Sequence, residues 1–550
     1  NTAVGAFAFD AGTGADNTAV GSGALGGASN SAANNVAMGK DAGNAVSTGD
    51  SNTLIGGLAG DALTEGDSNV AVGTGSLGAD TKGDRNIAIG AGALEAQNFT
   101  TKTDSLNVGI GHAAGSGVTT GTQNTLIGAE AGDALTTGGE NVAVGAFALS
   151  AEDGNGKNVA VGVQALLSQN AGAEAYNVAV GYLAGKAVTT GTRNTLIGGE
   201  AGDQLTDADY NVAIGMGALG ADVTGNKSVA IGVDALATQN RSGDNLNVAV
   251  GYDAGLSMTT GTANTLIGGL AGDALTDGSN NITLGKGALS ADTRGCRSVA
   301  IGSLALASQN STTLANVYNV AVGDSAGTAV TTGINNTLIG GTAGDALTVG
   351  IENVAVGYNA LGADDVGAKN VAIGAYALQK QNAPTATSNS FLNVAVGHSA
   401  GSEIVEGYYN TLIGSNAGDN ITSGQSNIII GQGIDAASAT AHGQLNIGNW
   451  ITGATNGSLS VSAADGFADN AFAMRVENLE ATDDRSYGLY IQAGSTATDS
   501  ALHVYEHTGS TSLFRVNGDG NVIVGGTSTV GFKFHVYGDA SIERSGTSSQ

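Results

Sequence analysis

A short apolar unit closed by glycine recurs along most of the chain. Asn247–Gly251 reads NVAVG, and the units that follow it read NTLIG, NITLG and SVAIG. Their closing glycines keep a constant period of 17, at Gly251, Gly268, Gly285 and Gly302. A fixed period of this length indicates a repeat architecture, in which each unit stacks on its neighbours.

The units are grouped in fours. From Gly39 onward the spacing of closing glycines runs 17, 17, 17 and then 19 to 23, so that Gly111, Gly181 and Gly251 keep a constant interval of 70. Thr-Thr-Gly marks the first unit of a group, Ala-Gly-Asp the second, Ala-Leu the third, and Gln-Asn with a longer loop the fourth. With a degenerate last unit at Gly448, the count predicts about 26 coils.

The pattern within each unit predicts one coil with two short strands. The first strand is rich in β-branched residues, as in Val248–Val250. The glycine after it permits a corner, and an alanine three residues later, such as Ala254 or Ala271, suits a second strand that faces a thin core. A turn rich in Thr, Asp and Gly leads to the next coil. We therefore predict an all-β fold, a parallel β-solenoid, over residues 1–450.

An asparagine opens almost every unit. Stacked coils place these side chains one above another, where amides satisfy one another along the stack. Ser228 and Ser298 replace asparagine in this column, so the position favours a small hydrogen-bonding residue. The predicted structural ladder includes Asn124, Asn141, Asn158, Asn194, Asn211 and Asn264.

Both faces of the first strand are apolar. Strand alternation places Val248 and Val250 on one face and Ala249 on the other. One face fills the interior of the coil, and the other needs a partner, most simply the same face of identical chains. This pattern predicts a homo-oligomer.

The period stops after Trp450, and residues 451–550 are predicted to form a second, all-β region of β-prism-like or intertwined strands. Alternating segments separated by Gly, Asn and Asp turns predict strands at Phe472–Val476, Tyr487–Ile491, Leu502–Tyr505, Leu513–Val516, Val522–Val524 and Phe532–Tyr537.

Composition narrows the classes of partner. The net charge of −29 disfavours nucleic acid, because phosphate binding needs a basic surface. No 18-residue apolar run occurs, so no membrane insertion is expected. A single cysteine, Cys296, excludes an intrachain disulfide framework. The chain opens at Asn1 inside a repeat unit, so we expect it to be an excerpt of a longer protein.

The stacked units resemble two families. NVAVG followed by an alanine three residues on is similar to the head of YadA-like trimeric adhesins, which implies a left-handed parallel β-roll. The runs NTLIG, AGDALT and NVAVG, continuing into Leu513–Val522 and Phe534–Ala540, are more similar to bacteriophage tail fibres. In such fibres an intramolecular chaperone commonly follows and is cleaved off after trimerisation.

The resemblance implies an intertwined homotrimeric fibre that attaches to a host-cell surface. Its implied partners are a second and third copy of itself, tail or baseplate proteins that bind a part preceding Asn1, and a host glycan or outer-membrane receptor. Its implied location is the virion tail. The alternative is a trimeric autotransporter-type adhesin or extracellular filament on a bacterial cell surface.

The loops of the fourth coils vary most and are the candidate interaction surface, since loops on a rigid repeat often bind partners. A second interpretation is that they are exposed spacers or wedges against a neighbouring chain. The candidate residues in these loops are Phe99, Tyr176, Arg241, Tyr318 and Phe391.

No catalytic constellation is found. Gly215–Gly220 matches GxGxxG, but no helical pattern follows it, so no cofactor is expected. His503 and His507 match H-x-x-E-H in an alternating strand, which leaves a metal at a trimer interface as an alternative and gives no peptidase site. Asp203 and Asp273 of Ala-Gly-Asp are interpreted as turn caps. We expect no enzyme and no resident metal.

Overall fold

The computed structural model describes residues 1–27, 30–382, 391–453, 459–461, 500–505, 512–517 and 522–524. The chain divides into two compact units, Asn1–Ser460 and Val461–Gln550. The first unit therefore extends slightly beyond residue 450, where the sequence predicts the end of the repeat region.

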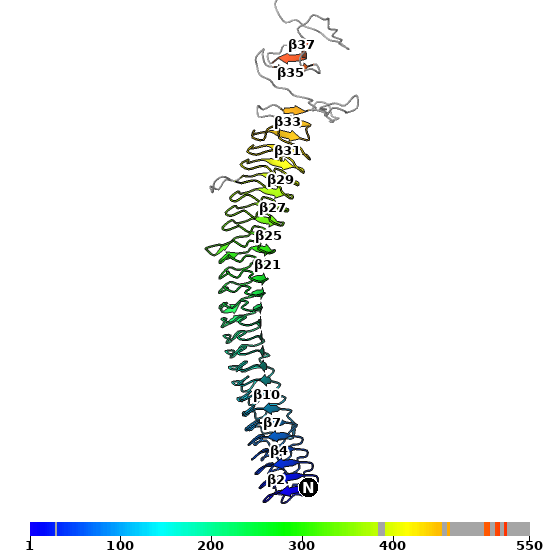
Figure 1. Ribbon diagram of the computed structural model, residues 1–550, viewed down its shortest axis with the longest axis vertical. Coiled ribbons are helices and arrows are strands. Elements are labelled where there is room, and N and C mark those ends of the chain that lie inside the picture. Colours follow the sequence, from blue (N-terminus) through cyan, green and yellow to red (C-terminus); the bar gives the residue numbers. More distant parts are fainter. Residues whose placement is uncertain are drawn as a thin grey trace, which may run out of the picture. The chain divides into compact units, whose positions relative to one another are not determined.

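The first unit is a parallel β-solenoid of about 26 coils, as the repeat predicted. One three-residue strand from each coil pairs in parallel, in register, with the strand of the next coil, from β1 to β32 without a break (Figure 1). The strands of this ladder are β1 (Thr2–Val4), β2 (Thr18–Val20), β3 (Val36–Met38), β4 (Thr53–Ile55), β5 (Val70–Val72), β7 (Ile87–Ile89), β9 (Val108–Ile110), β10 (Thr125–Ile127), β11 (Val142–Val144), β12 (Val159–Val161), β13 (Val178–Val180), β14 (Thr195–Ile197), β15 (Val212–Ile214), β17 (Val229–Ile231), β19 (Val248–Val250), β20 (Thr265–Ile267), β21 (Ile282–Leu284), β23 (Val299–Ile301), β25 (Val320–Val322), β26 (Thr337–Ile339), β27 (Val354–Val356), β28 (Val371–Ile373), β29 (Val394–Val396), β30 (Thr411–Ile413), β31 (Ile428–Ile430) and β32 (Leu445–Ile447).

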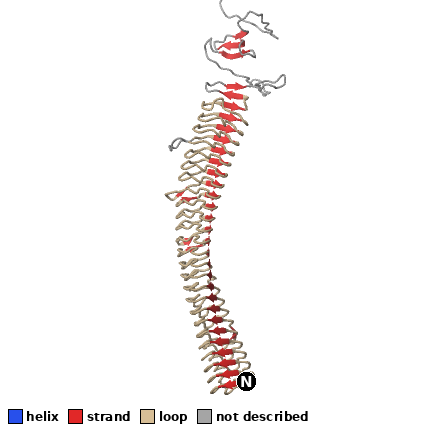
Figure 2. Cartoon of the chain, viewed as in Figure 1, coloured by secondary structure: helices blue, strands red, loops and turns tan. Residues whose placement is uncertain are grey.

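The second strand predicted for every coil is wrong. After the corner glycine the chain forms a turn, so that one continuous column of strands runs along the stack and the rest of most coils is loop (Figure 2). Glu200 (φ 57°) and Gly202 (φ 56°) adopt left-handed conformations on either side of Ala201, and a strand needs successive residues at negative φ. The Ala201 N–H bonds the Gly198 carbonyl at 3.4 Å within this turn.

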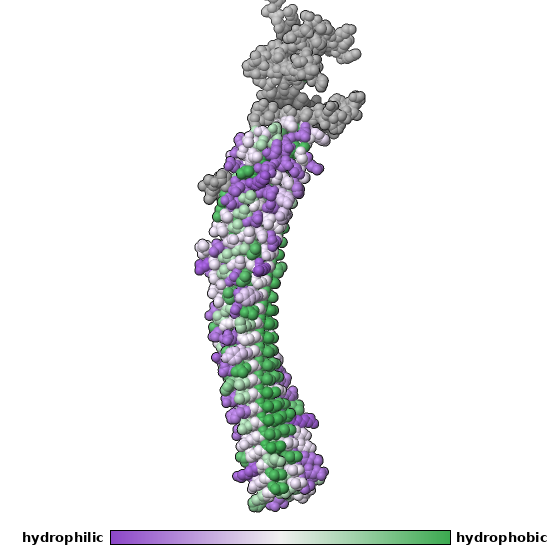
Figure 3. All heavy atoms as spheres, viewed as in Figure 1, coloured by the Kyte–Doolittle hydropathy of each residue, from purple (hydrophilic) through white to green (hydrophobic). Residues whose placement is uncertain are grey.

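The ladder strands have one buried and one outward face. The middle residue of nearly every strand is buried, whereas the first and third residues are half-buried or exposed. In the space-filling view a hydrophobic band follows the column of strands (Figure 3). We call the first and third residues of the strands from β2 to β31 the apolar ridge. They are Val, Ile, Leu or Met, except that threonine takes the first position in β2, β4, β10, β14, β20, β26 and β30.

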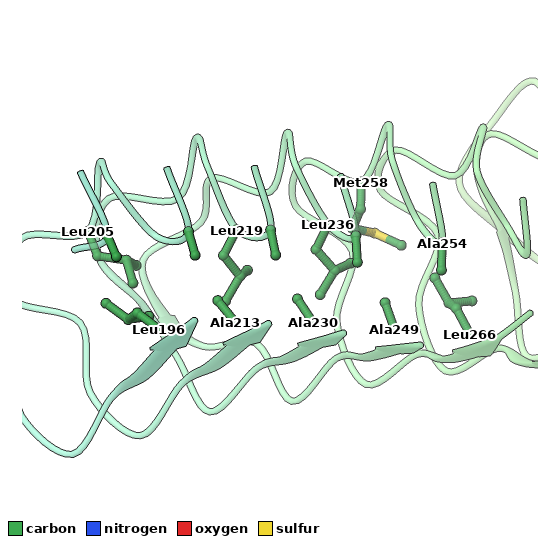
Figure 4. Packing of buried hydrophobic residues seen from close by; sticks show 14 of the residues in the cluster. Leu196, Leu205, Ala213, Leu219, Ala230, Leu236, Ala249, Ala254, Met258 and Leu266 are labelled. Atoms are coloured by element: carbon green, nitrogen blue, oxygen red, sulfur yellow. The ribbon is translucent and has the colours of Figure 1, made fainter. Parts of the chain in front are cut away.

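The core fits large side chains against small ones. Where the strand contributes Leu196, the opposite wall of the coil contributes Gly202. Where the strand contributes Ala213, the opposite wall contributes Leu219 (Figure 4). All of these leucines and alanines are fully buried, and this alternation fills the thin interior at the density that cores require.

The same fit explains the grouping in fours. The first coil of a group contributes small residues to both walls of the core, with Ala179 in the strand and Gly185 opposite. A Cβ added at Gly185 would lie 2.7 Å from Leu196 Cδ1 of the next coil and 3.0 Å from Leu166 Cδ2 of the previous coil. Leucines from both neighbours therefore occupy the space that the first coil leaves.

Three short ladders tie fourth-coil loops back to the preceding coil. Each is a pair of two-residue parallel strands. The pairs are β6 (Gly83–Asp84) with β8 (Thr103–Asp104), β16 (Gly225–Asn226) with β18 (Gly243–Asp244), and β22 (Gly295–Cys296) with β24 (Ala315–Asn316).

Beyond β32 the pattern changes. β33 (Ile451–Gly453) runs antiparallel to β32, and β34 (Leu459–Val461) follows. In the second unit β35 (Ser500–Tyr505), β36 (Ser512–Asn517) and β37 (Val522–Val524) form an antiparallel sheet, at three of the segments predicted as strands. The strands predicted at Phe472–Val476, Tyr487–Ile491 and Phe532–Tyr537 lie outside the described residues.

Candidate functional site

The apolar ridge is a surface feature that runs along the described coils from β2 to β31. In β21, Ile282 and Leu284 are each 46% exposed, while Thr283 between them is buried. In β19, Val248 and Val250 are half-buried. Soluble monomers rarely expose contiguous apolar patches of more than a few hundred Å², so a ridge that continues over more than twenty coils is the candidate interaction surface of the described chain.

Columns of outward residues border the ridge on its two sides. The residue before each ladder asparagine forms the pre-asparagine column, and the two residues after each corner glycine form the post-glycine columns. Every residue of the pre-asparagine column from Asp16 to Ser426 has a positive φ, for example 59° at Arg193 and 60° at Tyr210. Left-handed backbone is uncommon for such residues, so the coil geometry imposes it.

The structure places two candidate loop residues in the pre-asparagine column. Tyr176 is 44% and Tyr318 is 47% exposed. Cations from neighbouring coils lie over these rings, with Lys157 5.5 Å and Arg193 5.9 Å from the Tyr176 centroid and Arg297 5.7 Å from the Tyr318 centroid. The tyrosines therefore belong to a stack of rings and cations beside the ridge.

The other three candidate residues are less accessible. Phe99 is 6% and Phe391 is 4% exposed, so these rings anchor the loop bases and offer little surface to a partner. Arg241 is half-buried and donates to the Asp244 carbonyl at 3.2 Å. Most of the last loop, residues 383–390, lies outside the described residues.

The asparagine column connects the coil in two directions. Asn194 Oδ1 accepts from the Asn211 backbone N–H of the next coil at 3.0 Å. Asn194 Nδ2 donates to the Ala208 carbonyl across its own coil at 2.7 Å. The same two bonds recur at Asn124 and Asn264. Each of these buried asparagines thus links neighbouring coils and also holds its own coil closed.

A buried carboxylate in the third coil of five groups was not predicted from the sequence. Asp222 is fully buried and accepts from Gln239 Nε2 at 2.6 Å and from the Gly225 N–H at 3.0 Å. Gln239 Oε1 accepts in turn from Asn247 Nδ2 at 2.8 Å. This carboxylate cluster joins the third, fourth and first coils of consecutive groups.

The same spacing recurs in five groups, where a buried acid lies one coil before a buried glutamine, and this spacing was the available signal in the sequence. The glutamine amide donates to the acid in four of these groups. In the group with Glu152, Gln169 instead donates to the Thr189 carbonyl, and Glu152 accepts from Asn155. The sequence pattern identifies these glutamines only as markers of the fourth coil. The pairs are Asp80 with Gln97, Glu152 with Gln169, Asp222 with Gln239, Asp292 with Gln309 and Asp364 with Gln381.

Burial shifts the protonation of these acids. Loss of solvation raises the pKa of Asp80, Glu152 and Asp222 above the usual range. It raises the pKa of Asp364 to about 6, even though hydrogen bonds from the Gly367 N–H and the Gln381 amide act to lower it. The folded-state pKa of Asp364 lies above the ordinary value of 3.8. The contribution of the protonated side chain to the free energy of unfolding is therefore complete below about pH 3.8 and is lost as pH rises through about 6.

We expect Asp364→Asn to remove this pH dependence. A pKa raised from 3.8 to about 6 corresponds to about 3 kcal/mol when the change is complete. Between about pH 7.5 and about pH 4 the wild-type chain should therefore gain roughly 2–3 kcal/mol of stability relative to the variant. Calorimetric melting at both pH values measures the difference, with exposed Asp324→Asn as the matched control. A wild-type minus Asp364→Asn difference that is constant with pH would contradict the assignment.

The Ala-Gly-Asp aspartates lie at separate turns. Burial raises the pKa of Asp203, Asp273 and Asp345. Asp133 accepts from the Ser150 hydroxyl of the next coil at 2.6 Å. These side chains occupy the turn that follows the core alanine in the second coil of each group.

The motifs with possible chemistry fall in the repeat or outside the described chain. Gly215–Gly220 is the corner and turn after β15. His503 lies in β35, and His507 lies outside the described residues. Among the described residues, no group of three or more His, Cys, Asp or Glu side chains is placed to hold a metal ion. That part of the chain also contains no helix long and apolar enough to cross a membrane.

Comparison of the chain with protein-family models, with curated proteins and with solved structures gave no match. The function is therefore inferred from the geometry of the ridge, the ladder and the loops.

Proposed function

We propose that this chain is one protomer of a homotrimeric, left-handed β-roll fibre that reaches to and attaches to a host-cell surface, as a bacteriophage tail fibre does. The observation that carries the proposal is the apolar ridge, which runs in register with an unbroken parallel ladder from β2 to β31. Three ridges facing a common axis would remove this surface from water along the length of the stack.

The stack suits a mechanical role. At ~4.8 Å per coil, 26 coils span on the order of 120 Å. Backbone ladders, the asparagine column and a closely packed core connect every coil to the next. Such a column transmits force along its axis, which is what a fibre that extends from a particle needs.

Attachment would use the fourth-coil loops. They recur once in every group of four coils on a rigid scaffold and carry exposed side chains such as Leu314, which is 63% exposed. Three copies of each loop would supply avidity for a surface glycan or an outer-membrane receptor. We further propose that the fibre is located in the virion tail and that tail or baseplate proteins bind a part of the protein that precedes Asn1.

The test is retention of labelled full chain on a panel of intact bacterial strains. We expect saturable retention on at least one strain. Replacing both Ile282 and Leu284 with glutamate should weaken retention roughly tenfold or more, because a less stable trimer loses avidity. Val349→Glu, an exposed apolar site away from the ridge, is the control. Absence of retention on every strain would contradict attachment, and retention on animal cells alone would favour the adhesin.

A further inference from the structure

We propose that the two borders of the apolar ridge are complementary halves of one interface, so that the pre-asparagine column of one copy contacts the post-glycine columns of the next copy around the fibre axis. This inference rests on the homotrimer proposed above. It adds which residues meet, how the copies are oriented and what fixes their axial register.

The two borders are continuous columns. On the pre-asparagine border, Arg193 lies 5.4 Å from the Tyr210 centroid and donates to its hydroxyl at 3.1 Å, one coil away. On the post-glycine border, Tyr358 and Tyr376 stack edge-to-face at 5.4 Å, and Tyr376 and His398 at 5.7 Å, again coil upon coil. Each border therefore presents an ordered row of side chains beside the ridge.

The borders differ in charge. Six of the nine charged residues in the pre-asparagine column are basic, although acids outnumber basic residues 48 to 19 in the whole chain. Six of the eight charged residues in the post-glycine columns are acidic. The basic set is Arg85, Lys157, Arg193, Lys227, Arg297 and Lys369, and the acidic set is Asp41, Glu130, Glu200, Asp234, Asp253 and Asp324.

Cyclic symmetry brings opposite borders together. Copies that run parallel around one axis meet through a heterologous contact, in which one border of a copy faces the other border of its neighbour. An antiparallel pair would instead bring each border against itself, basic against basic. The observed charges therefore favour parallel copies, because the antiparallel arrangement would bring like charges into contact and is disfavoured by their repulsion.

The symmetry also sets which residues meet. A cyclic axis carries no translation, so residues at the same height pair across the interface. Arg193 and Glu200 border the same strand, β14, and the chain between them is less than half of a coil, so their heights differ by less than half of the ~4.8 Å rise. Lys227 and Asp234 border β17 in the same way. Both pairs match a basic residue with an acidic residue of the next copy.

The acidic partners are free to make these pairs. Within the described chain, Glu200 and Asp234 form no ion pair, and Arg193 contacts only tyrosines through its guanidinium. Lys227 pairs with exposed Asp244 at 2.6 Å, a surface contact that a second acid could share or replace. Charge pairs at the border of an apolar interface contribute orientation and association rate more than affinity.

Crosslinking of the full chain tests the pairing. Arg193→Cys and Glu200→Cys chains, one of them tagged, are coexpressed and treated with a short bismaleimide, so that any link between the two forms joins different copies. We expect covalent pairs of one tagged and one untagged chain. Each variant expressed alone, and the wild-type chain with its buried Cys296, should give no linked pair. Lys227→Cys with Asp234→Cys repeats the test at an independent coil.

The outcomes separate this inference from the trimer itself. Links in the Arg193→Cys chain alone would show that like borders meet and would overturn the inference. Particles with the mass of three chains but no links at either coil would overturn it while leaving the trimer standing. Particles with the mass of one chain would overturn both.

Discussion

Replacing Gly198 with alanine should destabilise the two stacked coils that contain β14 and β15. Gly198 has a φ of 138°, and a Cβ at this position would overlap the carbonyl oxygen of Gly215, the corner glycine of the next coil. Backbone strain of this kind costs ~1–3 kcal/mol, and the overlap adds a steric cost of similar size. We expect a loss of about 2–6 kcal/mol in the local stability of these coils.

Hydrogen exchange measures this effect where it occurs, since a stack of coils opens locally. The backbone amides of β14 and β15 should lose about 100-fold protection, the equivalent of about 3 kcal/mol. Gly199→Ala is a matched control one residue away, because a Cβ there meets nothing within 4 Å. Equal protection in the two variants would mean that the corner does not require glycine.

Asn194→Leu should be nearly as damaging. The change removes the acceptor of the Asn211 N–H and the donor to the Ala208 carbonyl, and both of these groups are buried. Each buried group left without a partner costs ~1–3 kcal/mol. We therefore expect a loss of about 2–6 kcal/mol.

The same exchange measurement applies, read at β14 and β15 for Asn194→Leu and at β17 and β19 for the control variant. Asn240→Leu is the matched control, because its side chain is exposed and its only described hydrogen bond comes from the backbone. Protection that falls equally in both variants, or in neither, would contradict the two-way role of the ladder asparagine.

The strand and its ladder could be predicted because their residues differ from their surroundings. Val248–Val250 combines β-branched residues with a fixed position before Gly251, and parallel pairing of identical units follows from the period. The asparagine column could be predicted for a similar reason, since the same residue recurs at one place in nearly every coil.

The rest of the coil depends on backbone conformation that residue type does not reveal. Glu200 and Leu219 are residue types that seldom adopt left-handed backbone, yet both have a positive φ. The available signal was Gly217, which occupies the position of Glu200 two residues after the corner glycine in the next coil. An alignment of coils would have exposed this substitution pattern as a left-handed site.

The carboxylate cluster was missed for a different reason. Asp222 lies among Gly, Thr and Asn residues that predict a surface turn, and only packing of three coils buries it. Its partner Gln239 lies one full coil further along the chain, so the pair becomes visible only when coils are superposed. Phe99 and Phe391 were proposed as surface residues on loop variability alone, which does not distinguish a loop tip from its anchor.

The mass of the purified particle tests the central claim most directly. Three chains in one particle would bury the apolar ridge, whereas one chain would leave it in water. Mass photometry of the full chain should give a single species of about three times 53.4 kDa. A stable, soluble species of 53.4 kDa at the same concentration would contradict the account.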